Sequence, residues 1–258
     1  MGKDGLILHT EDGGGTWTKQ ASGISKDLYY VAFATAKSGW AVCQNGAILH
    51  TKDGGGIWKN QTSGIENWLS SVGFATPQSG WATGGYGVIV HTEDGGGTWE
   101  KQTSGASSTL ESIAFPTTES GWAVGKNGVI LHTEDGGGTW TKQASGIEAW
   151  LFSVAFATPE SGWVVGENGL ILHTEDSGHT WKKQTSGIRE FLRSVTFPTP
   201  QPGWAVGGKG VILNTEDGGR TWKMQTSGVT SELWSVAFPT PQVGWAVGDN
   251  GIILHYEK

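Results

Sequence analysis

The chain has 258 residues, of which 43 are glycine and 15 are tryptophan, and its formal net charge is −7. An acidic chain lacks the basic surface that a general nucleic-acid binder needs, and no apolar run is long enough to cross a membrane. Cys43 is the one cysteine, so no disulfide can form within the chain.

The chain opens on a short strand that ends in the segment Thr10–Trp17, and near-copies of this segment recur along the whole sequence. An aspartate in a turn accepts hydrogen bonds from nearby backbone amides, and the glycines after it tolerate positive φ. We therefore predict a loop between two strands at each copy, with the aspartate in a structural role. The six aspartates are spaced 41 residues apart, at Asp12, Asp53, Asp94, Asp135, Asp176 and Asp217.

One repeat contains four short stretches that are apolar or alternating, which predicts four antiparallel strands. In the repeat that starts at residue 151, these strands are Leu151–Phe156, Trp163–Val165, Leu170–Thr174 and Trp181–Gln184. A tight Asn-Gly turn is expected at Gly166–Gly169. Four strands in roughly 40 residues are typical of a propeller blade. The sequence therefore predicts an all-β, six-bladed β-propeller of four-stranded antiparallel blades, built as one domain from residues 1–258.

The two ends of the chain together supply the sixth blade in this interpretation, and they contain the third strand twice, at Leu6–Thr10 and Ile252–Tyr256. The C-terminal copy follows a short turn, which is cheap to close, whereas the N-terminal copy carries the Asp12 loop and a hairpin. We expect Leu6–Thr10 to pair beside Trp245–Val247 and residues 252–258 to lie outside the regular blade. An exposed edge strand favours weak self-association of an otherwise monomeric protein.

The repeated loop resembles the Asp-box, or bacterial neuraminidase repeat. The unit from Ser120 to Trp140 is similar to repeats of the photosystem II assembly and stability factor family, and this resemblance covers essentially the whole chain. It implies a propeller that binds segments of membrane subunits without catalysis, in the thylakoid lumen or another extracytoplasmic compartment. Members usually have seven blades, whereas this chain has six repeats and no signal peptide at its start.

Sialidase chemistry is the enzymatic alternative, and it needs three arginines around the substrate carboxylate. The chain has only Arg189, Arg193 and Arg220, and Arg220 lies in an Asp-box loop at the opposite end of the strands. We therefore expect no enzyme activity and no cofactor.

A histidine recurs at one position of the third strand, at His9, His50, His91, His132, His173 and His255. Equivalent positions on separate blades lie too far apart for one metal ion, so a structural histidine is expected. One aspartate in each loop is likewise too few for calcium. The sequence predicts no metal site.

The repeats differ mainly before the first strand and in the turn between the second and third strands. Both connections lie at the same end of an antiparallel blade, and loops on a rigid scaffold often carry binding residues. We predict a ligand-binding face there, with the candidate residues Trp68, Tyr86, Trp150, Arg189, Phe191, Arg193 and Trp234.

The predicted function is therefore a binding or scaffold propeller whose partner, by resemblance, is a protein segment, as in photosystem II assembly. Two alternatives stay open. One is a lectin-like propeller in which Trp68, Trp150 and Trp234 stack on the sugar rings of a glycan. The other is an engineered or reconstructed repeat scaffold without a natural ligand, which the close likeness of the repeats favours.

Overall fold

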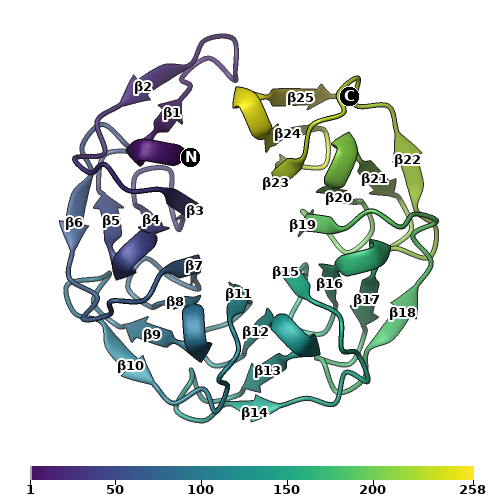
Figure 1. Ribbon diagram of the computed structural model, residues 1–258, viewed down its shortest axis with the longest axis horizontal. Helices are drawn as coiled ribbons and strands as arrows, with labels where there is room; N and C mark the ends of the chain where they lie inside the picture. The colour runs from purple at the N-terminus through teal and green to yellow at the C-terminus, as the bar shows by residue number, and fades with distance from the viewer. Residues whose placement is uncertain (1) are drawn as a thin grey trace. The chain divides into compact units, whose positions relative to one another are not determined.

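The computed structural model describes residues 2–258, and it consists of antiparallel sheets joined by short turns (Figure 1). Within these residues five sheets have four strands each, and in every one the strands pair in chain order. Their strands are β3 (Leu28–Phe33), β4 (Gly39–Cys43), β5 (Ile48–Thr51), β6 (Lys59–Gln61), β7 (Leu69–Phe74), β8 (Gly80–Gly84), β9 (Ile89–Thr92), β10 (Glu100–Gln102), β11 (Leu110–Ala114), β12 (Gly121–Gly125), β13 (Ile130–Thr133), β14 (Thr141–Lys142), β15 (Leu151–Phe156), β16 (Gly162–Gly166), β17 (Ile171–Thr174), β18 (Lys182–Gln184), β19 (Leu192–Thr196), β20 (Gly203–Gly207), β21 (Ile212–Thr215) and β22 (Lys223–Gln225). The predicted fold class is confirmed, because these are the antiparallel blades of an all-β propeller. No helix in the described part of the chain is long and apolar enough to cross a membrane.

The terminal strands form two smaller sheets, and here one prediction is wrong. β1 (Ile7–His9) pairs with β2 (Thr18–Gln20), while β23 (Leu233–Thr240), β24 (Val243–Gly248) and β25 (Ile253–Glu257) form a three-stranded sheet. The C-terminal copy of the third strand therefore occupies the place beside β24, with Trp245 opposite His255. The turn Asp249–Gly251 is short, so its closure costs little entropy. This advantage outweighs the hydrogen bonds of the Asp12 loop, which close the N-terminal hairpin. The self-association expected from a surplus strand stays a prediction.

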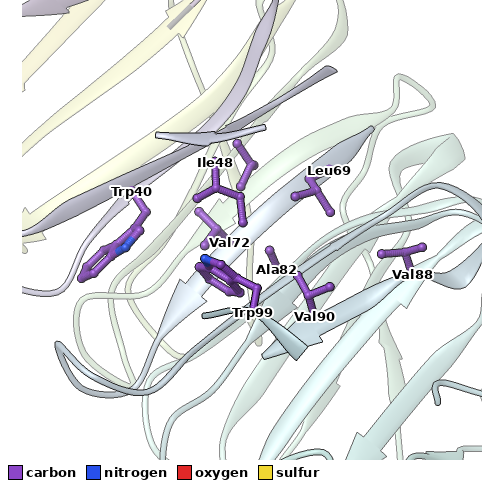
Figure 2. Close-up of a cluster of buried hydrophobic side chains, with 9 residues drawn as sticks. Trp40, Ile48, Leu69, Val72, Ala82, Val88, Val90 and Trp99 are labelled. Carbon is purple, nitrogen blue, oxygen red and sulfur yellow. The ribbon is translucent and has the colours of Figure 1, made fainter. Parts of the chain in front are cut away.

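The contacts of the chain define two compact units. The first runs to Ala123 and includes Leu131–Lys142, and the second contains Val124–Ile130 and Gln143–Lys258. In the first unit, a buried cluster joins the sheet β3–β6 to the sheet β7–β10. Trp40 of β4 is fully buried there and stacks on Phe74 of the neighbouring sheet, with ring centroids 3.6 Å apart. Figure 2 shows Trp40 and Trp99 among the aliphatic side chains of this cluster.

The second unit repeats the same packing with equivalent residues. Trp163 of β16 is fully buried, and its ring centroid lies 3.5 Å from that of Phe197 in the next sheet. Trp222, which directly precedes β22 of that sheet, meets Phe197 edge-on. Trp81 and Trp204 make the same stacking contact, with Phe115 and Phe238 of the next sheet. The regular tryptophan spacing in these strands therefore reflects inter-blade contacts.

The Asp-box loop connects the third and fourth strands of a blade, and its aspartate closes it. In the copy between β13 and β14, Asp135 Oδ1 accepts hydrogen bonds from the Thr139 amide and the Thr133 hydroxyl, both at 2.8 Å. Asp135 Oδ2 accepts a bond from the Thr139 hydroxyl, also at 2.8 Å. These bonds, that of the Thr139 amide first, lower the pKa of Asp135 to about 2. Gly137 has φ +92°, a conformation that side chains rarely adopt.

The recurring histidine also has a packing role. The His50 ring stacks on Trp40 at 4.4 Å, and its Nε2 lies 3.1 Å from the Ser38 hydroxyl. The equivalent contacts join His173 to Trp163 and to Ser161. Across residues 2–258 there is no group of three or more metal-binding side chains.

Candidate ligand-binding face

The two variable connections of a blade are held together by a main-chain hydrogen bond. The first residue of the turn after the second strand donates its amide to the carbonyl of the residue before the first strand. Gly208 donates to Phe191 at 3.0 Å, and Glu167 donates to Trp150 at 3.0 Å. The approach is close, since a Cβ added at Gly207 would lie 1.9 Å from the Phe191 oxygen. Residues that are about 17 positions apart in the sequence are thereby brought side by side.

A β-bulge sets the direction of one side chain in each of the first strands β15, β19 and β23. The pairing register shifts between Leu192 and Ser194 in β19, which leaves Arg193 as the bulged residue. The same shift leaves Phe152 bulged in β15 and Trp234 bulged in β23. A bulge re-aims the side chain of its extra residue and commonly occurs next to functional sites.

Hydrogen bonds between neighbouring first strands bring these bulged residues together. The Val195 amide of β19 donates to the Ser153 hydroxyl of β15 at 3.3 Å. The Val236 amide of β23 donates to the Ser194 hydroxyl of β19 at 3.2 Å. The three strands therefore lie next to one another with their bulges at equivalent positions.

The result is a group that we call the Arg193 cluster, which consists of Phe152, Phe191, Arg193, Glu232 and Trp234. The Arg193 guanidinium carbon lies 4.3 Å from the ring centroid of Phe152, 4.7 Å from that of Phe191 and 4.6 Å from that of Trp234. Arg193 Nε donates to Glu232 Oε1 at 2.5 Å. Phe191 and Trp234 stay 39% and 48% exposed. A cation between aromatic faces is favourable, and the ion pair neutralises its charge.

Polar and aromatic contacts extend this cluster on both sides. Trp234 Nε1 donates to Asp249 Oδ1 at 2.8 Å. On the other side, Phe152 contacts Trp150 with centroids 5.1 Å apart, and Lys126 Nζ lies 4.1 Å from the Trp150 ring centroid. These residues all belong to the second unit, so this unit carries a row of aromatic side chains with basic groups between them.

The structure gathers only some of the seven candidate residues. Phe191, Arg193 and Trp234 belong to the Arg193 cluster, and Trp150 lies beside it. Arg189 is exposed, and its guanidinium forms no hydrogen bond or ion pair with the described residues.

Trp68 and Tyr86 belong to the first unit, where their ring centroids lie 5.6 Å apart. Tyr86 has φ +57°, at a turn position that asparagine fills in several other repeats. The indole of Trp68 covers Gly85, where an added Cβ would lie 2.9 Å from the ring. These two aromatic residues form a separate exposed pair.

Two members of the cluster, Phe152 and Glu232, were not among the predicted site residues. Leu151 and Val154 are both buried, although they are three residues apart. That spacing breaks the alternation of a regular strand, so it is the signal that could have located the bulge at Phe152.

The family model of the photosynthesis system II assembly factor YCF48 matches the chain over residues 17–105, 102–189 and 185–257. No curated protein matches the chain. The fold of this chain is similar to that of a solved structure described as YCF48 bound to D1 peptide. The two are 22% identical, with 90% of this chain and 94% of that chain covered and a TM-score of 0.53.

YCF48 from Cyanidioschyzon merolae is 19% identical, with 90% of this chain and 96% of that one covered and a TM-score of 0.51. The GH74 enzyme of Niastella koreensis is 14% identical with a TM-score of 0.75, and the match covers 98% of this chain but 52% of the enzyme. At these identities the structures show a shared propeller fold. The family model, which spans nearly all of the sequence, shows that the chain belongs to the photosynthesis system II assembly factor YCF48 family.

Proposed function

We propose that the chain binds an extended protein segment at the Arg193 cluster and catalyses no reaction. The observation that carries this proposal is the pair of large aromatic side chains, Phe191 and Trp234, which stay partly exposed while Arg193 holds them in place. Aromatic residues and arginine dominate the binding energy of protein interfaces. A row of such side chains supplied by three neighbouring strands suits a ligand that crosses several blades.

The family supports the same class of partner. Its description names an assembly factor, and one similar structure is described as bound to a D1 peptide. A D1 peptide is therefore the first ligand to test on this chain. A location in the thylakoid lumen or another extracytoplasmic compartment belongs to the same proposal, and so does a single domain formed by residues 1–258.

The contacts of the tryptophan rings favour a protein segment over a glycan. Stacking on a sugar needs an open ring face, yet a cation already lies over Trp234 and another over Trp150. Trp68 contacts Tyr86 instead. One face of Trp234 and one face of Trp150 are therefore already occupied by a cation, which leaves less ring surface for a sugar.

The proposal is tested by titrating the chain with a fluorescently labelled D1 peptide and following the anisotropy of the label. We expect the double substitution Phe191→Ser with Trp234→Ser to weaken binding roughly tenfold or more, since truncation of an aromatic anchor commonly costs about 2 kcal/mol. Both side chains are partly exposed, so the fold should persist.

A matched control is Met224→Ser in β22. Met224 is 62% exposed and is not part of the Arg193 cluster, so its replacement removes exposed apolar surface elsewhere. Affinity should be unchanged in this variant. Equal affinity of the wild type and the double variant would contradict the proposal, as would a wild type that binds no D1 peptide.

A further inference from the structure

The Arg193 guanidinium is only partly satisfied by the protein. A guanidinium carries five N–H groups, and the one on Nε donates to Glu232. Neither Nη1 nor Nη2 of Arg193 donates to any acceptor within residues 2–258. The side chains of Arg193 and Glu232 are each only 21% exposed, so these remaining N–H groups lie in a sheltered place. An oxygen atom of a bound segment is the natural partner for them.

The aromatic rings restrict where such an oxygen can approach. The rings of Phe152, Phe191 and Trp234 lie within 4.7 Å of the guanidinium carbon, and Glu232 occupies the Nε position. The ends of Nη1 and Nη2 are the part of the group that stays available. A planar pair of donors of this kind can donate hydrogen bonds to a carboxylate or to the carbonyl oxygen of a peptide.

The charge around Arg193 distinguishes these two ligands. Glu232 already neutralises Arg193. A second carboxylate, that of Asp249, accepts a hydrogen bond from Trp234 Nε1 at 2.8 Å. The nearby Lys209 is paired with Glu190 at 3.4 Å. Arg189 and Lys126, which form no ion pair with the described residues, lie outside the Arg193 cluster. At Arg193 itself a ligand carboxylate would therefore meet the carboxylates of Glu232 and Asp249, whereas a carbonyl oxygen would accept the same hydrogen bonds without that repulsion.

We infer that Glu232 is a specificity-determining residue, which makes the Arg193 cluster prefer a neutral segment of protein over an acidic one. This inference rests on the proposed function, because it concerns which segment the same site accepts. Glu232 acts through Arg193 in this role: it fills one side of the guanidinium and cancels its charge, so the ligand is recognised by hydrogen bonding and aromatic contact.

The test compares two forms of one D1 peptide, the first with all its carboxylates and the second with each Asp, Glu and terminal carboxylate converted to the amide. The wild type should bind the amide form more tightly, by roughly three- to tenfold. Glu232→Gln keeps an oxygen beside Arg193 Nε but removes the charge. In this variant the preference should disappear or reverse, because Arg193 becomes an uncompensated cation.

Two further variants make the result specific. Glu216→Gln changes the net charge equally at a side chain that is 71% exposed and outside the cluster, so the wild-type preference should remain. Glu232→Asp keeps a carboxylate on the same residue, one methylene further from Arg193, so it should retain the direction of the preference. The circular dichroism spectrum of each variant checks that the fold is intact.

The outcomes separate this inference from the proposed function. If the wild type binds both peptides and Glu232→Gln has the same ratio of affinities as Glu216→Gln, the inference is wrong while the proposed function stands. A wild type that prefers the acidic peptide also overturns the inference. If neither peptide binds the wild type, the proposed function fails, and the inference fails with it.

Discussion

Replacement of Trp163 by phenylalanine should lower the free energy of unfolding by about 2 to 3 kcal/mol. Trp163 is fully buried, and its Nε1 donates to the Gly218 carbonyl at 3.2 Å. The substitution removes this hydrogen bond, worth about 1 kcal/mol, and two buried ring carbons, worth about 0.8 kcal/mol each. Gly218 keeps a bond from Gln184 Nε2 at 3.4 Å, so its carbonyl is not left without a donor.

Urea unfolding with linear extrapolation measures this loss, and Trp245→Phe is the comparison variant. Trp245 stacks on His255 at 5.0 Å, and its buried Nε1 has no hydrogen-bond partner among the described residues. Removing that N–H gives up no hydrogen bond, and Trp245 is half-buried whereas Trp163 is fully buried, so the loss should be smaller than at Trp163 by at least about 1 kcal/mol. Equal losses in the two variants would refute the idea that the Trp163 hydrogen bond stabilises the contact between blades.

Two further predictions concern the Asp-box and the last strand. Because the folded pKa of Asp135 is about 2 and its ordinary value is 3.8, its stabilisation should be complete above the ordinary value and lost as the pH falls through the folded value. Asp135→Asn should therefore lower the melting temperature at pH 7, and its difference from the wild type should shrink between about pH 4 and pH 2; a difference independent of pH would contradict this. Deletion of residues 252–258 should destabilise the chain in urea, since it removes a strand paired with β24, and an unchanged midpoint would show that β25 contributes nothing.

Much of the fold could be predicted because each repeat carries the same local signals. The strand predicted at Leu151–Phe156 has the bounds of β15, and the Asn-Gly turn appears at Glu167–Gly169 with Asn168 at φ +55°. These features depend on neighbours in the sequence. The choice between the two copies of the third strand depends instead on two opposing free-energy contributions. One is the low entropy cost of closing the short C-terminal turn, and the other is the hydrogen bonding of the N-terminal hairpin that Asp12 closes. The sequence shows that both contributions exist but not how large each free energy is, so the prediction placed the wrong copy beside β24.

The candidate face was predictable by position but not by geometry. Differences between repeats pointed to Phe191, Arg193 and Trp234, since variation is easy to see against a constant background. The contacts of Phe152 and Glu232 with Arg193 depend on β-bulges and on the packing of neighbouring first strands. The spacing of Leu151 and Val154 could have indicated the bulge at Phe152. Inter-blade hydrogen bonds to serine hydroxyls have no simple signature in one sequence, so the contacts of Phe152 and Glu232 with Arg193 are seen only in three dimensions.

The bond between Gly208 and Phe191 joins main-chain atoms only, and this has a consequence for how such proteins diversify. Since neither partner uses its side chain, point substitutions at the position of Phe191 can explore new chemistry without loosening the turn. The equivalent position in each blade can be substituted independently, and a substitution that does not improve binding costs little stability. The architecture therefore separates mutations that alter recognition from mutations that threaten folding.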